Sequence, residues 1–196
     1  MIFSMLRLSY SSRDKGEAVI DENQRRRISF AALTRQVSSY YEYPVKSNGA
    51  KLENISQFFI GKPESILFTT TYSGSFGSDA GVVLVEYNIT REDDAATVLK
   101  VKERLIIDEE VFEAFLLEDD ARIDEISKNT LKSEYDILEW DEGFKFRFFS
   151  RESATWQNSW DLREEIAAPE SVGLFAGDEP IIIIPIHAGQ LKQGSI

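Results

Sequence analysis

The sequence contains no cysteine and only one histidine, His187. Without cysteine the chain can form no disulfide, no thiolate nucleophile and no cysteine-ligated zinc site. Any Ser-His-Asp triad or histidine-ligated metal would have to include His187, which we interpret instead as a surface residue at the end of a strand. No apolar run approaches the roughly 20 residues that a membrane-spanning helix requires. The composition therefore predicts a protein without metal or cofactor, and not an enzyme.

Basic residues are scarce relative to acidic ones. The chain of 196 residues has 34 Asp and Glu against 22 Lys and Arg, which gives a formal net charge of −12. Nucleic acid phosphates and anionic lipid headgroups repel such a surface, and this argues against nucleic acid as a partner. The one basic cluster, Arg25–Arg27, is expected to pair with Asp21 and Glu22 one turn earlier on a helix. The length fits a single domain over residues 1–196.

The first third of the chain has the pattern of an amphipathic helix. Proline is absent between Lys15 and Tyr43. Phe30, Leu33, Val37 and Tyr41 recur at the spacing of one helical face. The pattern predicts a helix over residues 17–43, which ends before Pro44 because proline disfavours helical geometry in the residue before it.

Residues 64–190 are predicted to be β-rich, because β-branched and aromatic residues dominate several short runs. The segments Val82–Thr90 and Val98–Ile107 are expected to pair as an antiparallel hairpin. Pro185 cannot donate to a ladder, so the last strand should lie at a sheet edge or carry a bulge. A short helix is expected within residues 109–126, although Leu116–Leu117 could instead begin an edge strand. A flexible loop is expected over residues 73–81. The predicted strands lie at Ile66–Tyr72, Val82–Thr90, Val98–Ile107, Phe144–Phe148, Pro169–Phe175 and Ile181–Ile186.

Three other patterns suggest binding sites, and each has a simpler interpretation. Trp156 and Trp160 could form a platform for a ligand, although packing over the sheet is the preferred interpretation. Gly-rich residues 73–81 lack the lysine of a phosphate-binding loop. An acidic cluster could bind calcium but lacks EF-hand spacing, so we interpret it as a solvated face. That cluster consists of Glu118, Asp119, Asp120, Asp124 and Glu125.

The most informative segment begins at Phe144. Three phenylalanines alternate with a lysine and an arginine over Phe144–Phe148, which is the period of a half-buried strand. A Trp-x-x-x-Trp loop and an apolar strand led by Pro169 follow. This succession resembles the closing part of a J-type minor pseudopilin, a prepilin-like protein of the bacterial type II secretion system. The resemblance extends over about residues 20–190, with Asp21–Val37 similar to the family's soluble helix and Val82–Ile107 to its middle β-hairpin.

The resemblance implies a fold, a location and a function. The expected fold class is α+β, with a long N-terminal amphipathic helix packed on an antiparallel β-sheet. The domain would lie in the periplasm, anchored to the bacterial inner membrane through a helix upstream of this chain. It would be a structural subunit of the pseudopilus tip, which assembles with other minor pseudopilins and supports the export of folded proteins.

The partner-binding residues expected under this resemblance lie on the helix. If the apolar face of the helix covers the chain's own sheet, Ile20 and Ile28 remain on another face, available to a neighbouring helix. Two alternatives stay open. One is a minor pilin of a type IV pilus, and the other is a β-rich module that holds a small ligand at the Trp156–Trp160 loop.

Overall fold

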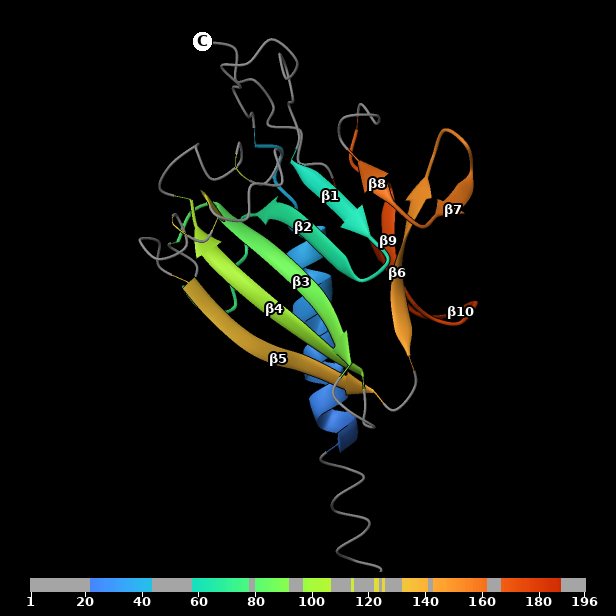
Figure 1. Cartoon of the computed structure of the whole chain (residues 1–196), viewed down its shortest axis with the longest axis horizontal. Helices are drawn as coiled ribbons and strands as arrows, with labels where there is room; N and C mark the ends of the chain where they lie inside the picture. Colours follow the sequence, from blue (N-terminus) through green and yellow to red (C-terminus); the bar gives the residue numbers. More distant parts are fainter. Residues whose placement is uncertain are drawn as a thin grey trace, which may run out of the picture.

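The computed structural model describes residues 22–43, 58–77, 80–91, 97–106, 114, 122–123, 125, 132–140, 143–161 and 167–187. Strands make up 53% of these residues and form two antiparallel sheets (Figure 1). One helix is described as a continuous element, over residues 22–38, and the isolated residues 114, 122–123 and 125 are also helical. The protein is therefore mostly β-sheet.

The larger sheet has six strands in the order β5-β4-β3-β2-β1-β8. Five of them follow one another along the chain as an antiparallel meander, in which β3 and β4 form the hairpin that the sequence predicts. The sixth, β8, pairs with β1 and lies in the sequence between two strands of the other sheet. The strands are β1 (Phe59–Lys62), β2 (Ser65–Thr70), β3 (Val83–Arg91), β4 (Thr97–Leu105), β5 (Lys132–Trp140) and β8 (Trp160–Asp161).

The smaller sheet has four strands in the order β10-β9-β6-β7. β10 lies at its edge, and its register against β9 shifts between Pro180 and Ile182. Both the edge position and the irregularity confirm the prediction made from Pro185. The strands are β6 (Phe144–Ser150), β7 (Thr155–Gln157), β9 (Ser171–Ala176) and β10 (Glu179–Pro185).

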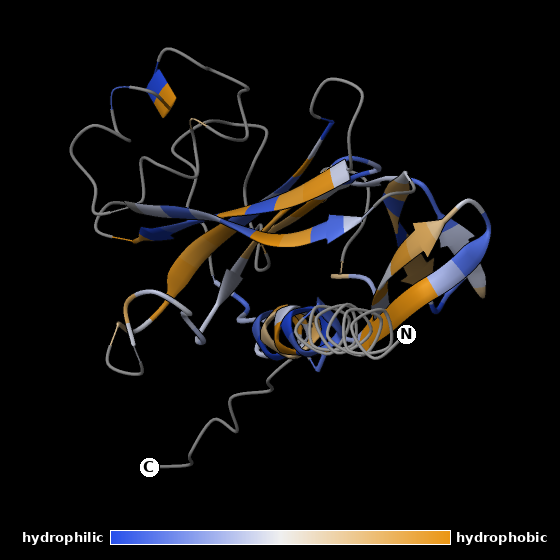
Figure 2. Cartoon of the chain, turned by 90° about the horizontal axis from the view of Figure 1, so that it is seen from below, coloured by the Kyte–Doolittle hydropathy of each residue, from blue (hydrophilic) through white to orange (hydrophobic). Residues whose placement is uncertain are grey.

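The predicted fold class, α+β with a long helix packed on one antiparallel sheet, is wrong. There are two sheets, and the short helix contacts both of them: Figure 2 looks nearly along the helix, which lies on one face of the larger sheet and beside the smaller one. Buried and half-buried residues alternate along β6 with a period of two, as in a half-buried strand of either sheet. That period does not reveal that β6, β7, β9 and β10 form a second sheet.

The helix also ends earlier than predicted, at residue 38 instead of Tyr43. Tyr40 forms an isolated antiparallel bridge with Thr70, the last residue of β2. The Thr70 hydroxyl donates to the carbonyl of Gln36 at 2.9 Å, which satisfies one of the carbonyl groups left open at the helix end. The last predicted turn does not form because β2 offers this segment backbone partners.

The inward face of the helix agrees with the prediction at most positions. Leu33 and Val37 are buried, and Phe30 packs against the core. Tyr40 is buried in place of Tyr41, since the chain has left the helical register by that point.

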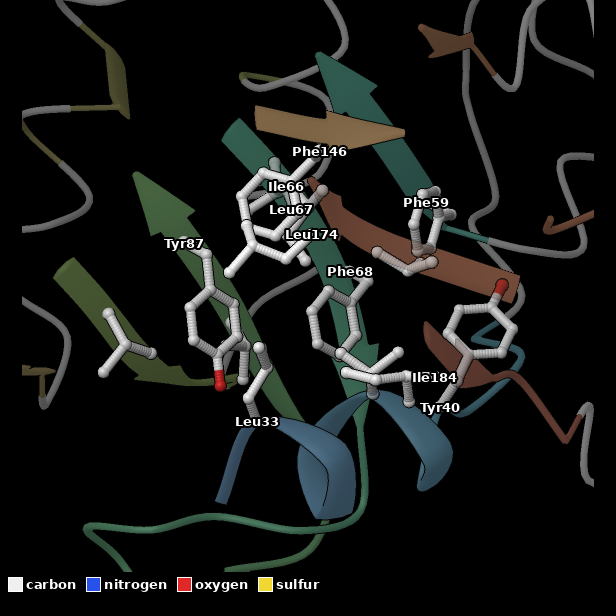
Figure 3. Close-up of a cluster of buried hydrophobic side chains, with 14 of the residues drawn as sticks. Leu33, Tyr40, Phe59, Ile66, Leu67, Phe68, Tyr87, Phe146, Leu174 and Ile184 are labelled. Carbon is white, nitrogen blue, oxygen red and sulfur yellow. The ribbon is translucent and has the colours of Figure 1, made fainter. Parts of the chain in front are cut away.

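One hydrophobic core joins the helix and both sheets (Figure 3). The rings of Phe59 in β1 and Phe148 in β6 meet edge to face with their centroids 5.8 Å apart. Phe68 and Tyr87 stack with centroids 6.2 Å apart. A backbone hydrogen bond of 2.8 Å from Phe146 to the Pro63 carbonyl also connects β6 with the turn between β1 and β2. The single domain over residues 1–196 stays a prediction.

Some parts of the sheets were not predicted. β1 and β5 were missed, and the tryptophan loop contains the short strands β7 and β8. Of the helix expected within residues 109–126, the structure describes residues 114, 122–123 and 125, which are helical. The other residues of that segment lie outside the described ranges.

The contact between the sheets predicts the effect of a small substitution. Gly61→Ala is expected to lower the free energy of unfolding by about 1–3 kcal/mol, the usual cost of overpacking. The new Cβ would lie 2.3 Å from Cζ of the buried Phe148 ring. In the control Gly143→Ala, the Cβ would lie 2.9 Å from the end of the Arg91 side chain, which can move aside. Urea unfolding measures both variants, and equal stabilities would contradict a tight contact between the sheets.

Candidate functional site

The outward face of the helix carries an exposed apolar residue. Ile28 has 62% of its surface exposed, and Ala31 on the next turn is exposed as well. Leu33 and Val37 lie on the opposite side, in the core. The helix is therefore amphipathic, and it leaves Ile28 without cover, as the sequence predicts. Ile20, which was predicted to share this role, lies outside the described residues.

The N-terminal half of the helix is held by Trp140, the last residue of β5. The guanidinium carbon of Arg26 lies 4.4 Å from the centre of the Trp140 ring, within the range of a cation–π contact. The ring of Phe30 lies 6.3 Å from the same indole. Arg26 also forms an ion pair of 2.5 Å with Glu22 one turn earlier, as predicted for this basic cluster. Asp21 lies outside the described residues.

Two serines of the helix bind carbonyl groups of edge strands. The register of β4 against β5 shifts so that Ile137 has no partner in β4, and its carbonyl accepts a hydrogen bond from the Ser29 hydroxyl. The Ser38 hydroxyl donates to the carbonyl of Pro185 in β10 at 3.1 Å. The helix thus binds one edge strand of each sheet, where unpaired carbonyl groups would otherwise be exposed.

The C-terminal half of the helix is held by a buried carboxylate, Glu103 of β4. Glu103 is 0% exposed. Its oxygens accept hydrogen bonds from the Gln36 side-chain amide at 2.6 Å, the Ser73 hydroxyl at 2.5 Å and the Tyr135 hydroxyl at 2.8 Å. These donors come from the helix, from the loop after β2 and from β5. One carboxylate therefore fixes three elements that are far apart in the sequence.

The loop after β2 surrounds the same carboxylate with backbone N–H groups. Gly74 donates to Glu103 at 3.0 Å and Ser75 at 3.2 Å. A Cβ at Gly74 would lie 2.6 Å from the Tyr135 hydroxyl, so the position requires glycine. The loop, which lacks the lysine of a phosphate-binding loop, thus binds an anion of its own chain, the Glu103 carboxylate.

Gln36 connects this carboxylate to a third strand. While its amide N–H donates to Glu103, its amide oxygen accepts a hydrogen bond from the Tyr87 hydroxyl. Figure 3 shows the Tyr87 hydroxyl pointing toward the helix. Gln36 is 1% exposed, and both ends of its amide are used. The helix is consequently fixed in rotation and in position along its axis.

The network shifts the pKa of its members in opposite directions. Burial alone would raise the pKa of Glu103, but hydrogen bonds from Ser73, Tyr135, Gly74 and Ser75 outweigh it, so this pKa is lower than usual. Burial and the nearby carboxylate raise the pKa of Tyr135. The carboxylate is therefore ionised and the tyrosine neutral, which is the arrangement that these hydrogen bonds require.

The sequence contains signals for this network that do not belong to any short motif. Leu99, Val101 and Glu103 alternate on the inward side of β4, so a charged residue occupies a core position. Gln36 likewise falls between Leu33 and Val37 on the apolar face of the helix. A polar residue at an inward position predicts a buried hydrogen-bond partner.

A groove of about 480 Å³ runs between the helix and β5. Its wall includes Arg25 and Ser29 on the helix side and Asp136 and Glu139 on the strand side. The groove carries charges of both signs together with apolar side chains of β4 and β5. Ile28 is not part of its wall.

The two tryptophans of the predicted platform do not form a common surface. Trp160 is 4% exposed, and its indole N–H donates to the Ala167 carbonyl at 3.0 Å. Trp156 packs against Phe149 and Phe175 on the smaller sheet, with ring centroids 5.4 and 5.0 Å apart. These contacts confirm the packing interpretation of both residues.

Of the remaining sequence candidates, His187 and part of the acidic cluster lie within the described residues. His187 is exposed. Within the ranges that the structure describes, no group of three or more His, Cys, Asp or Glu could hold a metal ion. Of the acidic cluster, Glu118, Asp119, Asp120 and Asp124 lie outside those ranges. In the same part of the chain, no helix is long and apolar enough to cross a membrane.

No protein-family model matches the chain, and no curated protein matches it.

Glu103→Gln is expected to lower the free energy of unfolding by about 2–3 kcal/mol, because it replaces one acceptor oxygen by an amide that faces other donors. Glu134→Gln is a matched control on the neighbouring strand. Its ion pair with Lys102 is 3.4 Å long and exposed, so we expect its loss to cost less than about 1 kcal/mol. Urea unfolding at pH 7 measures both variants, and equal losses would contradict the central role of Glu103.

The lowered pKa of Glu103 also predicts how stability depends on pH. Because the folded state lowers this pKa, its contribution is present above the unfolded value of about 4.3 and is lost as the pH falls through the folded value. The stability difference between wild type and Glu103→Gln should therefore be largest near neutral pH and shrink in acid. A difference that stays constant down to the acid limit of folding would contradict this assignment.

Proposed function

We propose that this chain is a structural subunit of the type II secretion pseudopilus tip, which assembles with other minor pseudopilins and supports the export of folded proteins. The observation that carries the proposal is the outward helix face with its exposed Ile28. The resemblance of the sequence to J-type minor pseudopilins over about residues 20–190 supplies the class.

The proposal does not need a long helix. Assembly through a helix requires that the helix be rigid and that one face of it be accessible. The inner face of residues 22–38 is held at Trp140, at Glu103 through Gln36, and at Pro185 through Ser38. These contacts leave the outward face to a neighbour.

We infer that the domain acts as a scaffold and not as a catalyst. The buried carboxylate of Glu103 accepts hydrogen bonds from five groups of its own chain, which occupy both of its oxygens. Such a group holds elements together and offers no site for a substrate. In this proposal the domain lies in the periplasm, anchored to the bacterial inner membrane.

Two alternatives differ in what they predict. A minor pilin of a type IV pilus would use the same helix face with a different set of partners, so the identity of the partner separates the two classes. A small-ligand module would need an open tryptophan site. The separate packing of Trp156 and Trp160 gives that alternative no support.

Ile28→Asp should weaken association with the soluble domains of the other minor pseudopilins from the same secretion system by roughly tenfold or more, since it puts a charge in an apolar contact. The side chain is exposed, so thermal stability should not change. Isothermal titration calorimetry with the purified domains measures the affinity.

Ile183→Asp is the matched control. Ile183 is the other strongly exposed isoleucine among the described residues, at 49%, and it lies on β10 instead of the helix. We expect it to retain full affinity. Equal weakening by the two variants, or loss of thermal stability in Ile28→Asp, would contradict a specific helix interface.

A further inference from the structure

The exposed charges of the helix point to the chemistry of its partner. We infer that the outward helix face binds an acidic protein surface, with Arg25 and Arg27 pairing with carboxylates on either side of a small apolar contact at Ile28 and Ala31. This inference rests on the proposed function, and it adds which residues select the partner.

Charge is segregated within the chain. The whole protein has a formal net charge of −12. Residues 22–38 carry four arginines and a single acidic residue, Glu22, so this helix is basic within an acidic protein. The exposed charged residues of its outward face are arginines.

The four arginines do not have the same role. Arg26 pairs with Glu22 and lies over Trp140, so it serves the fold. Arg35 lies over the ring of Tyr72, with its guanidinium carbon 4.8 Å from the ring centre. Arg25 and Arg27 are exposed, and neither forms an ion pair with another described residue.

The geometry of the helix places these two arginines beside the apolar contact. Residues three or four apart are neighbours on a helix surface. Arg25 therefore adjoins Ile28, and Arg27 adjoins Ala31, while Ile28 and Ala31 are neighbours of each other. A guanidinium is weakly hydrated and binds carboxylates through two parallel hydrogen bonds, which suits a contact that must lose water at its centre.

An acidic protein fits this surface better than the other polyanions. An anionic membrane or a nucleic acid would attract the helix but repel the rest of the chain. One isoleucine and one alanine also offer little apolar area for insertion into lipid. Two copies of the chain repel each other through their equal net charge. A partner whose negative charge is confined to the contact surface avoids these penalties.

The test uses the same purified minor pseudopilin domains. The double variant Arg25→Glu and Arg27→Glu should weaken binding at least fivefold in 50 mM salt, and wild-type affinity should fall as salt rises. The control for Arg27→Glu is Arg151→Glu, which makes the same charge reversal in the exposed turn between β6 and β7. The Arg151 variant should bind like wild type.

The outcomes separate this inference from the proposed function. If wild type binds a minor pseudopilin but neither salt nor the arginine variants change the affinity, the charge inference is wrong and the proposed function stands. Absence of binding to every minor pseudopilin overturns both. The inference would also be overturned if phosphatidylglycerol vesicles, DNA or a second copy of the chain bound as tightly as a minor pseudopilin does, and if that binding depended on the same arginines.

Discussion

The structure depends on the hydrogen bonds to one buried carboxylate. A charge removed from water is tolerated only where donors replace its hydration. Glu103 obtains these donors from the helix, from the loop after β2 and from β5, so none of the three can move without leaving an acceptor open. Hydrophobic contacts hold the same elements together but allow sliding, because apolar attraction has no direction. Hydrogen bonds to fixed oxygens do not allow such sliding. The network around Glu103 therefore determines the position of the helix over the larger sheet.

In this position the helix also covers backbone carbonyl groups on two edge strands, β5 and β10. Edge strands carry unpaired backbone groups that can pair with another chain. Ser29 binds the carbonyl that the irregularity in β5 leaves open, and Ser38 binds a carbonyl of β10. Pro185 itself has no N–H to offer at that edge. The helix therefore covers core residues with one face and edge carbonyl groups with its flanks, and the face that remains is the one with Ile28.

Local patterns predicted the strands well where the alternation is regular, as in β3, β4 and β6. They also predicted that β10 lies at an edge or carries a bulge, because proline cannot donate a hydrogen bond to a ladder. β5 was missed because its register shift at Ile137 breaks the alternation. The helix end was wrong because Tyr40 pairs with Thr70, a partner remote in sequence. The fold class was wrong for a related reason, since periodicity assigns strands but not their sheet. Of the candidate site, Ile28 could be predicted from the helical pattern, whereas the network around Glu103 depends on contacts between distant segments.

The fixed helix has a consequence for binding. A surface that must order itself on association loses part of the interaction free energy to conformational entropy. Here the backbone of the helix is already held by Trp140, Gln36 and Ser38, so a partner at the outward face meets a formed surface. The arginine side chains keep their freedom, which lets them adapt to carboxylates without moving the helix. The rigid apolar contact and the adaptable charges around it would therefore have different roles in binding. Ile28 would determine the affinity for a partner. The arginines would determine which partner binds and how fast it associates.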